Sequence, residues 1–263
     1  MRNHKQHRAR WAVPLALAAF LPAAEDTGRL TFKVKPAEIQ VGPFWGGEMV
    51  RVEGLVAADA KVVVLVRGQG REETFNRKGR VGPIWVNTGK VHVSGVPSLF
   101  LRFTSGALKS FLGREAIEKH QLDEASIRHQ MRIEPERDHD LILANWLTLK
   151  ARDGTFAIVR DGVRMGAPGP AGVPYSVEFS WPKKAPPGPY EVSVYECCNQ
   201  EVTRSASIPL PVVKVGFPAW LSGIAADRAA LYGVVAVLAA ALAGFGIDFL
   251  ATLFFGKRRA RAH

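Results

Sequence analysis

Two adjacent cysteines, Cys197 and Cys198, are the only thiols in this 263-residue sequence. A disulfide normally joins Cα atoms about 5.5 Å apart, whereas chain neighbours lie about 3.8 Å apart, so a bridge between the two would be strained. On a strand, their side chains would also point to opposite faces. We therefore expect one buried and one exposed thiol. A vicinal disulfide or an intermolecular bridge, which would make the pair a redox site, and metal binding are the alternatives.

A second group that could do chemistry is the run Arg137-Asp138-His139-Asp140. Carboxylate and imidazole groups together could hold a metal or exchange protons. The run nevertheless lies at the start of a predicted helix that ends before Gly154. Acidic side chains in such a place cap free N–H groups and favour the positive end of the helix dipole. We expect capping here rather than chemistry.

The remaining sequence offers no catalytic motif. His120 and His129 are nine residues apart and match no metal-ligand spacing. The patterns of the nucleophile elbow, the P-loop, the dinucleotide-binding turn and the zinc proteases do not occur. We therefore expect a non-enzymatic protein with no catalytic residues, no cofactor and no metal.

Asp248 is the only charged residue in the apolar run of residues 229–255. About 20 residues suffice to cross a bilayer, so this run is a predicted transmembrane helix. Counting back in fours from Asp248 gives Gly244, Ala240 and Ala236, a face of small residues that lets another helix approach closely. A charge facing lipid is costly, so we expect contact with an integral membrane partner. Hydration of Asp248 from the cytoplasmic interface is the alternative.

The segments that flank the span and begin the chain predict its topology. Residues 256–263 form a basic tail, which the positive-inside rule places in the cytoplasm. Residues 1–24 combine a basic start, a short apolar stretch and small residues, the pattern of a signal peptide, although an uncleaved anchor is an alternative. We expect a single-pass inner-membrane protein whose main domain, residues 25–217, is periplasmic.

Residues 218–228 form a predicted interfacial segment between this domain and the span. Apolar residues recur there at helical spacing, and an aromatic residue stands where the outer end of the span is expected to meet the membrane–water interface. We expect this segment to lie along the lipid surface through Phe217, Trp220, Leu221 and Ile224.

The net charge of +11 comes largely from the two ends of the chain. Setting aside residues 1–24, the tail and Asp248 leaves 27 basic and 23 acidic residues. The basic excess is therefore a targeting signature, and we expect no nucleic-acid partner.

The periplasmic domain is predicted to be mainly β. Segments such as "RLTFKVKP", "KVVVLVRG" and "PIWVNTGKVHVSG" read as strands, with Gly and Pro every eight to twelve residues. Helix formers replace them at about residues 106–153, and Leu141, Ala144, Leu147 and Leu149 form a helical stripe there. We predict an immunoglobulin-like β-sandwich with this helical insertion, plus one C-terminal transmembrane helix; two separate domains are the alternative. Four aromatic residues are expected in its core: Trp45, Trp85, Trp146 and Trp181.

The segment "APPGPYEVSVYE" resembles the penultimate strand of immunoglobulin-like sandwiches, in which a turn leads to a tyrosine whose hydroxyl caps the corner. With "RKGRVGPIWVNTGKVHVSGVPSLF" and "KVGFPAWLSGIAADRAALYGVVAVLAAALAG", it also resembles an uncharacterised family of alphaproteobacterial transmembrane proteins. That resemblance implies a signal peptide, a periplasmic domain and one C-terminal helix. It also implies a loose association with sulfite-exporter-type permeases.

These features lead to two hypotheses about function. The first is an accessory subunit of an inner-membrane complex, either a transporter or a respiratory assembly, that meets its partner through the C-terminal helix. The second is a membrane-tethered module that binds or senses a small ligand or a redox species.

Overall fold

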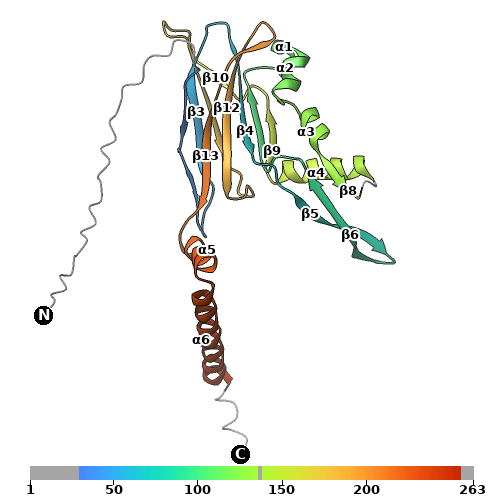
Figure 1. Ribbon diagram of the computed structural model, residues 1–263, viewed down its shortest axis with the longest axis vertical. Coiled ribbons are helices and arrows are strands. Elements are labelled where there is room, and N and C mark those ends of the chain that lie inside the picture. Colours follow the sequence, from blue (N-terminus) through green and yellow to red (C-terminus); the bar gives the residue numbers. More distant parts are fainter. Residues whose placement is uncertain (1–29, 136–137, 256–263) are drawn as a thin grey trace, which may run out of the picture.

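The computed structural model describes residues 30–135 and 138–255. Two β-sheets pack face to face, a layer of helices and a small third sheet cover one of them, and two helices extend from the end of the body (Figure 1). The mainly β fold class and the single C-terminal apolar helix expected from the sequence are confirmed.

The sandwich consists of a four-stranded and a six-stranded sheet. The smaller sheet has the order β1 (Phe32–Lys35), β3 (Met49–Val56), β11 (Val173–Ser180) and β10 (Arg164–Met165). The larger sheet has the order β2 (Ile39–Val41), β13 (Glu201–Lys214), β12 (Gly188–Cys198), β4 (Lys61–Gly68), β7 (Phe100–Thr104) and β9 (Phe156–Val159). The pairs β2–β13 and β7–β9 are parallel, and the other pairs within these sheets are antiparallel.

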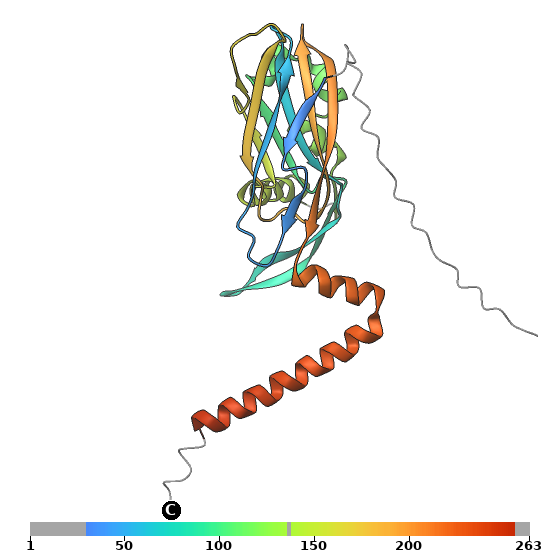
Figure 2. The same ribbon diagram turned by 90° about the vertical axis from the view of Figure 1, so that its left-hand side faces the viewer.

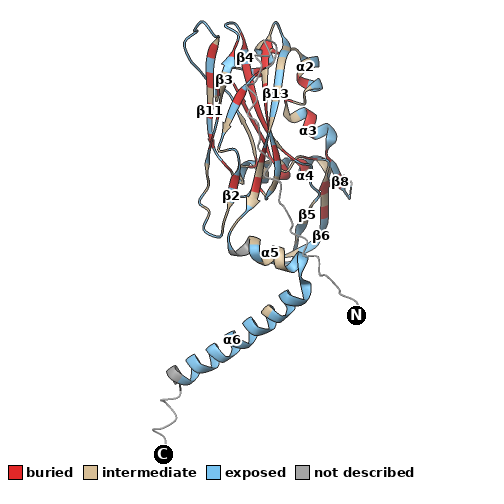
Figure 3. Ribbon diagram, turned by 60° about the vertical axis from the view of Figure 1, so that its left-hand side comes forward, coloured by how far each residue is buried: buried red, intermediate tan, exposed pale blue. Residues whose placement is uncertain are grey.

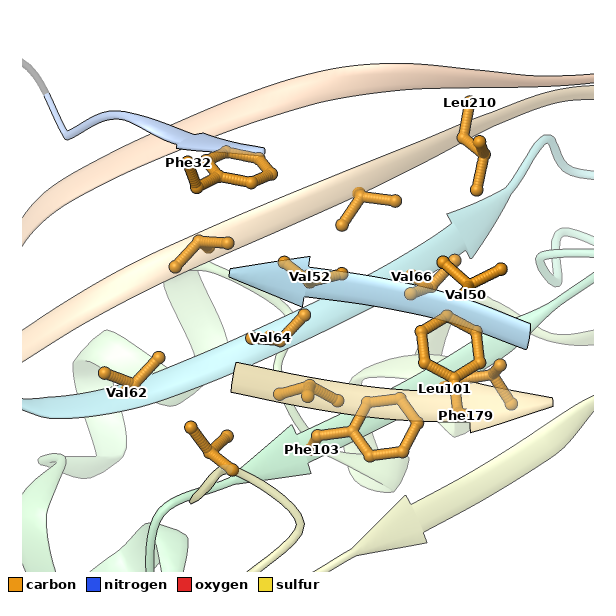
Figure 4. Close-up of a cluster of buried hydrophobic side chains, with 14 of the residues drawn as sticks. Phe32, Val50, Val52, Val62, Val64, Val66, Leu101, Phe103, Phe179 and Leu210 are labelled. Carbon is orange, nitrogen blue, oxygen red and sulfur yellow. The ribbon is translucent and has the colours of Figure 1, made fainter. Parts of the chain in front are cut away.

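Strand β4 is buried on both faces because it lies between two hydrophobic cores. Val62, Val64 and Val66 point into the core between the sheets, where they meet side chains of β3, β7 and β11 (Figure 4). Val63 and Leu65 point the other way, into a second core beneath the helices. Successive residues of a strand face opposite sides, so the uninterrupted apolar run "KVVVLV" is what a central strand with two covered faces requires.

The tyrosine corner predicted from "PPGPY" is present. The hydroxyl of Tyr190, at the start of β12, donates a hydrogen bond to the carbonyl of Pro186 four residues earlier. The indole of Trp181 meets the Tyr190 ring edge to face at 4.9 Å between centroids. Burial raises the pKa of Tyr190 to about 12, so this hydroxyl keeps its proton at neutral pH.

The helical insertion covers the outer face of the six-stranded sheet. It comprises α1 (Leu108–Phe111), α2 (Arg114–Lys119), α3 (Glu124–Gln130) and α4 (His139–Arg152), with the short strand β8 (Arg132–Glu134) between α3 and α4. Strand β8 pairs with β6 (Ile84–Ser94), which pairs with β5 (Glu73–Val81), so these three form a separate sheet. The strand patterns of β5 and β6 were expected to continue the sandwich. They instead form a hairpin that projects from the body (Figure 1).

The buried face of α4 differs from the predicted stripe. Leu143 and Trp146 are buried, whereas Leu141, Ala144 and Leu149 are exposed. Leu147, the remaining member of the predicted stripe, packs partly buried against the second core. The expectation was therefore confirmed at Leu147 and wrong at Leu141, Ala144 and Leu149.

Two helices follow the sandwich. α5 (Phe217–Asp227) begins directly after β13, and α6 (Ala229–Phe255) continues from it in a different direction (Figure 2). The change of direction falls at Arg228, whose φ of −142° and ψ of 61° are not helical. Residues 1–24 and 256–263, predicted as signal peptide and basic tail, lie outside the described residues.

Candidate functional site

The long C-terminal helix α6 lies free of the body. Of the helices that the structure describes, it is the one long and apolar enough to cross a bilayer, and it is exposed along nearly its whole length (Figure 3). The sequence predicted the span for this reason: residues 229–255 are apolar all round, which is typical of a helix whose surroundings are lipid.

The predicted packing face of α6 is open. Ala236, Ala240, Gly244 and Asp248 are all exposed, and a Cβ atom placed at Gly244 would meet no neighbouring atom within 4 Å. The backbone carbonyl of Asp248 accepts a hydrogen bond from Thr252 Oγ1 at 2.9 Å. Within the described part of the chain, no hydrogen bond or ion pair reaches the Asp248 carboxylate. The described part of the body therefore supplies no hydrogen bond or ion pair that stabilises this charge.

The predicted interfacial segment is the helix α5. Trp220 is exposed, and Leu221 and Ile224 are half-buried. Phe217 is the first residue of this helix, but its side chain lies outside the described part. Gly216, just before it, adopts a φ of +76°, a conformation that favours glycine and that turns the chain from β13 into α5.

The two cysteines point into different cores. Cys197 is buried among the residues beneath the helices, whereas the half-buried Cys198 packs against the core between the sheets. Both are free thiols. Burial, and then the neighbouring Cys198 and Glu196, raise the pKa of the Cys197 thiol to about 12. The thiolate that disulfide exchange requires is therefore scarce at Cys197 at neutral pH.

The charged run before α4 does not cap it as expected. Asp138 occupies the N-cap position with a φ of 58°, but its side chain makes no capping hydrogen bond. Its carboxylate instead lies 2.8 Å from a guanidinium nitrogen of Arg77, on the hairpin. This ion pair across the fold competes with the local bond, so the capping prediction was wrong for Asp138. Arg137 lies outside the described residues.

The histidines that the structure describes do not group into a metal site. His120 packs edge to face on Tyr195, with ring centroids 5.3 Å apart, and His139 Nδ1 lies 3.8 Å from Asp140 Oδ1. Across residues 30–135 and 138–255, no three side chains of His, Cys, Asp or Glu are close enough together to hold a metal ion.

Two arginines withdrawn from solvent, the half-buried Arg67 and the buried Arg102, were not singled out from the sequence. Arg67 donates to the Oε1 and the backbone carbonyl of Gln121 at 2.7 and 2.8 Å. Arg102 donates to the backbone carbonyl of Leu122, the residue that follows Gln121. Burial lowers the pKa of both guanidinium groups. They fasten the turn between α2 and α3 to the sheet. The sequence signal that could have indicated this role is that Arg67 interrupts the apolar run of β4.

The tip of the β5–β6 hairpin is apolar and exposed. Val81, Ile84 and Trp85 are 58%, 60% and 69% exposed. Trp85 was expected in the core, and that expectation was wrong, because its strand leaves the sandwich. Trp146 and Trp181 are buried as expected, and Trp45 is half-buried against the core between the sheets.

A mainly β body carrying one exposed apolar helix defines the class of this molecule: a membrane protein with a single span. The chain belongs to the family described as "Putative transmembrane protein (Alph_Pro_TM)", whose sequence pattern matches residues 29–252. This match confirms the family resemblance drawn from the sequence. Comparisons with curated proteins and with solved structures give no match.

Proposed function

We propose that this protein is a non-enzymatic accessory subunit of an inner-membrane complex, a transporter or a respiratory assembly, and that α6 is the element that binds its partner. The observation that carries this proposal is Asp248. Its carboxylate stands in an apolar helix, exposed and without a partner among the described residues. A charge in that position favours contact with protein or water over contact with lipid.

The neighbouring residues make a docking surface for another helix. Ala236, Ala240 and Gly244 precede Asp248 at intervals of four, so one face of α6 is smooth and carries a single carboxylate near one end. Close approach of two helices favours van der Waals contact and interhelical hydrogen bonds, the main contributions to association inside a bilayer. A partner helix with a donor or a cation opposite Asp248 fits this face.

The proposed orientation places the body in the periplasm and the C-terminus in the cytoplasm. Its support is the basic tail of residues 256–263 together with the signal-like pattern of residues 1–24.

The experiment compares partner recovery from native membranes for three variants of the full chain. Gly244→Leu blocks close approach, Asp248→Leu removes the carboxylate, and Gly246→Leu is the matched control, because residue 246 lies about 140° around the helix from the centre of the small face. All three keep the helix apolar, so all should insert. After purification in mild detergent, mass spectrometry measures the stoichiometry of each co-eluting membrane protein.

The proposal expects one membrane protein to be lost with Gly244→Leu, reduced with Asp248→Leu and retained with Gly246→Leu. An interhelical polar contact contributes about 0.6–2 kcal/mol, so the Asp248 variant should lose roughly 3- to 30-fold in affinity. Equal recovery in all three would make α6 a simple anchor with a hydrated carboxylate. A protein that elutes alone with a small bound molecule would favour the ligand-binding alternative.

A further inference from the structure

The end of the body from which α5 and α6 leave carries two exposed apolar tips. One is the β5–β6 hairpin tip, formed by Val81, Ile84 and Trp85 (Figures 1 and 2). The other is Phe44, fully exposed in the loop after β2. This loop adjoins the start of α5, since a Cβ atom at Gly216 would lie 3.8 Å from the Pro43 ring.

We propose that these two tips enter the interfacial region of the bilayer that α6 spans, where the basic hairpin binds anionic lipid headgroups. The body then rests on the membrane surface through separate loops in addition to its helix.

Among the residues that the structure describes, the distal hairpin has no paired strand that would account for its apolar residues. Strand β5 pairs with β6 from Glu73 opposite Val93 to Val81 opposite Ile84, but β8 pairs only with residues 92–94 of β6. Beyond that point the hairpin is two-stranded, and it closes in the two-residue turn Gly82-Pro83, where Gly82 has a φ of +62°. A two-stranded hairpin is marginally stable alone in water, so apolar side chains at its very tip indicate a contact outside this chain.

The direction of the hairpin is set by contacts near its base. The pairing register shifts between Arg77 and Lys78, which is a β-bulge, and bulges bend a strand and increase its twist. Next to this bend, Arg77 forms its 2.8 Å ion pair with Asp138, just before α4. The tip is therefore directed by the helical layer toward the end of the body that α5 leaves.

The charge of the hairpin matches an anionic lipid surface. Residues 74–94 contain four basic residues and no acidic residue. Lys78, Arg80 and Lys90 are exposed, and the structure gives none of these three an ion pair with a described residue. Tryptophan flanked by Arg and Lys is typical of membrane–water interfaces, and each basic residue near an anionic surface strengthens the attraction to it.

The distribution of apolar residues favours lipid over a protein groove. Val81 pairs with Ile84 on one face of the hairpin, and Arg80 pairs with Trp85 on the other. The tip thus presents apolar side chains on both faces, with Arg80 beside Trp85 on one of them, which suits a lipid interface that surrounds it. A protein groove would select one face, as in strands that add to a sheet edge.

The test uses the mature full-length protein in bilayers whose acyl chains carry bromine, which quenches the fluorescence of tryptophans that reach the lipid. The variant Trp85→Phe removes the tip indole while keeping an apolar side chain, and Trp181→Phe removes an indole from the core, where Trp181 is 1% exposed. In phosphatidylglycerol-rich bilayers, Trp85→Phe should lose quenched emission, whereas Trp181→Phe should lose unquenched emission. Trp220 contributes equally to all samples and cancels in the comparison.

The charge contribution is tested with the double variant Lys78→Gln/Arg80→Gln and with bilayers of phosphatidylcholine alone. Both should reduce the quenching of Trp85. An unchanged quenched fraction in Trp85→Phe would overturn the proposal. If neither the double variant nor the phosphatidylcholine bilayers changed the quenching of Trp85, the proposed binding of anionic headgroups would be overturned. A Trp85 that is unquenched in pure lipid but shielded from aqueous iodide in native membranes would assign the tip to a protein partner instead.

Discussion

The Nζ of Lys150, in α4, lies 2.5 Å from Oε1 of Glu73, the first residue of β5. The side chains are 12% and 21% exposed, so the pair is largely withdrawn from water. The Nε1 of Trp146 approaches the other carboxylate oxygen at 3.4 Å. One carboxylate therefore joins the hairpin base to the longest helix of the insertion.

Lys150→Met should destabilise the body by about 1–3 kcal/mol, because hydrogen bonds to charged groups contribute about that much and Glu73 would keep a half-buried charge. Hydrogen exchange of the amides of β5 and β6 should accelerate more than that of β4. Lys35→Met is the control, since it breaks the exposed pair with Glu53, which water screens and which is expected to contribute little to stability. Equal exchange in both variants would show that the Glu73 pair does not hold the hairpin.

Tyr190→Phe should destabilise the body and Tyr175→Phe should not, although both side chains are buried. The first removes the donor to the Pro186 carbonyl and should cost about 1–2 kcal/mol. The second removes a buried hydroxyl that has no partner among the described residues, so it should be neutral or stabilising. Denaturant titration of both variants measures the difference, and a destabilising Tyr175→Phe would indicate that its hydroxyl has a partner after all.

The stability of the body should fall as the pH rises above 9. Burial raises the pKa of the Cys197 thiol from its ordinary value of 9.0 to about 12, so between these values the unfolded chain has lost a proton that the folded chain keeps. The contribution of the protonated Cys197 thiol to the free energy of unfolding is therefore fully present below pH 9. It declines above that pH, by about 1 kcal/mol at pH 10. Thermal unfolding from pH 8 to 10.5 measures this slope.

Cys197→Ala should flatten that alkaline decline while lowering stability at pH 7, because it leaves a small cavity. Cys198→Ala is the matched control at a half-buried thiol and should keep the decline. A slope that is the same in Cys197→Ala and in the wild type would assign the alkaline sensitivity to another group, such as Tyr190, whose pKa burial raises to about 12.

The proposed orientation predicts the behaviour of reporters fused after His263. Green fluorescent protein should be fluorescent at this position, and alkaline phosphatase, which requires the periplasm, should be inactive. The opposite fusion, with the phosphatase replacing the chain after residue 217, should be active. An active phosphatase after His263 would reverse the orientation.

The sequence by itself determined the features that depend on local pattern. The apolar run of residues 229–255 has one solution in a bilayer, because a helix satisfies all its own backbone hydrogen bonds there. Side chains alternate along a strand with a period of two, and this period accounts for the strand pattern and for the two-sided burial of β4. The turn residues before Tyr190 likewise predict its tyrosine corner.

Only the tertiary structure decided which strands belong to the sandwich. Strands β5 and β6 have the same alternation as sandwich strands, but they pair with each other, and β6 with β8, outside both large sheets, and Trp85 is exposed as a result. Alternation reports that a strand forms and says nothing of which strand lies beside it. The exposed tip, and with it the proposed membrane contact, was therefore invisible to sequence patterns.

Long-range contacts also decided the roles of individual polar residues. The Asp138 side chain pairs with Arg77 instead of capping α4. The Arg67 and Arg102 side chains are withdrawn from solvent and hold the turn before α3. In each case a partner distant in sequence offered a charge or a carbonyl that local spacing did not reveal. Asp248 is the reverse case: the sequence singled it out, none of the described residues contacts its carboxylate, and we therefore propose that a partner helix does.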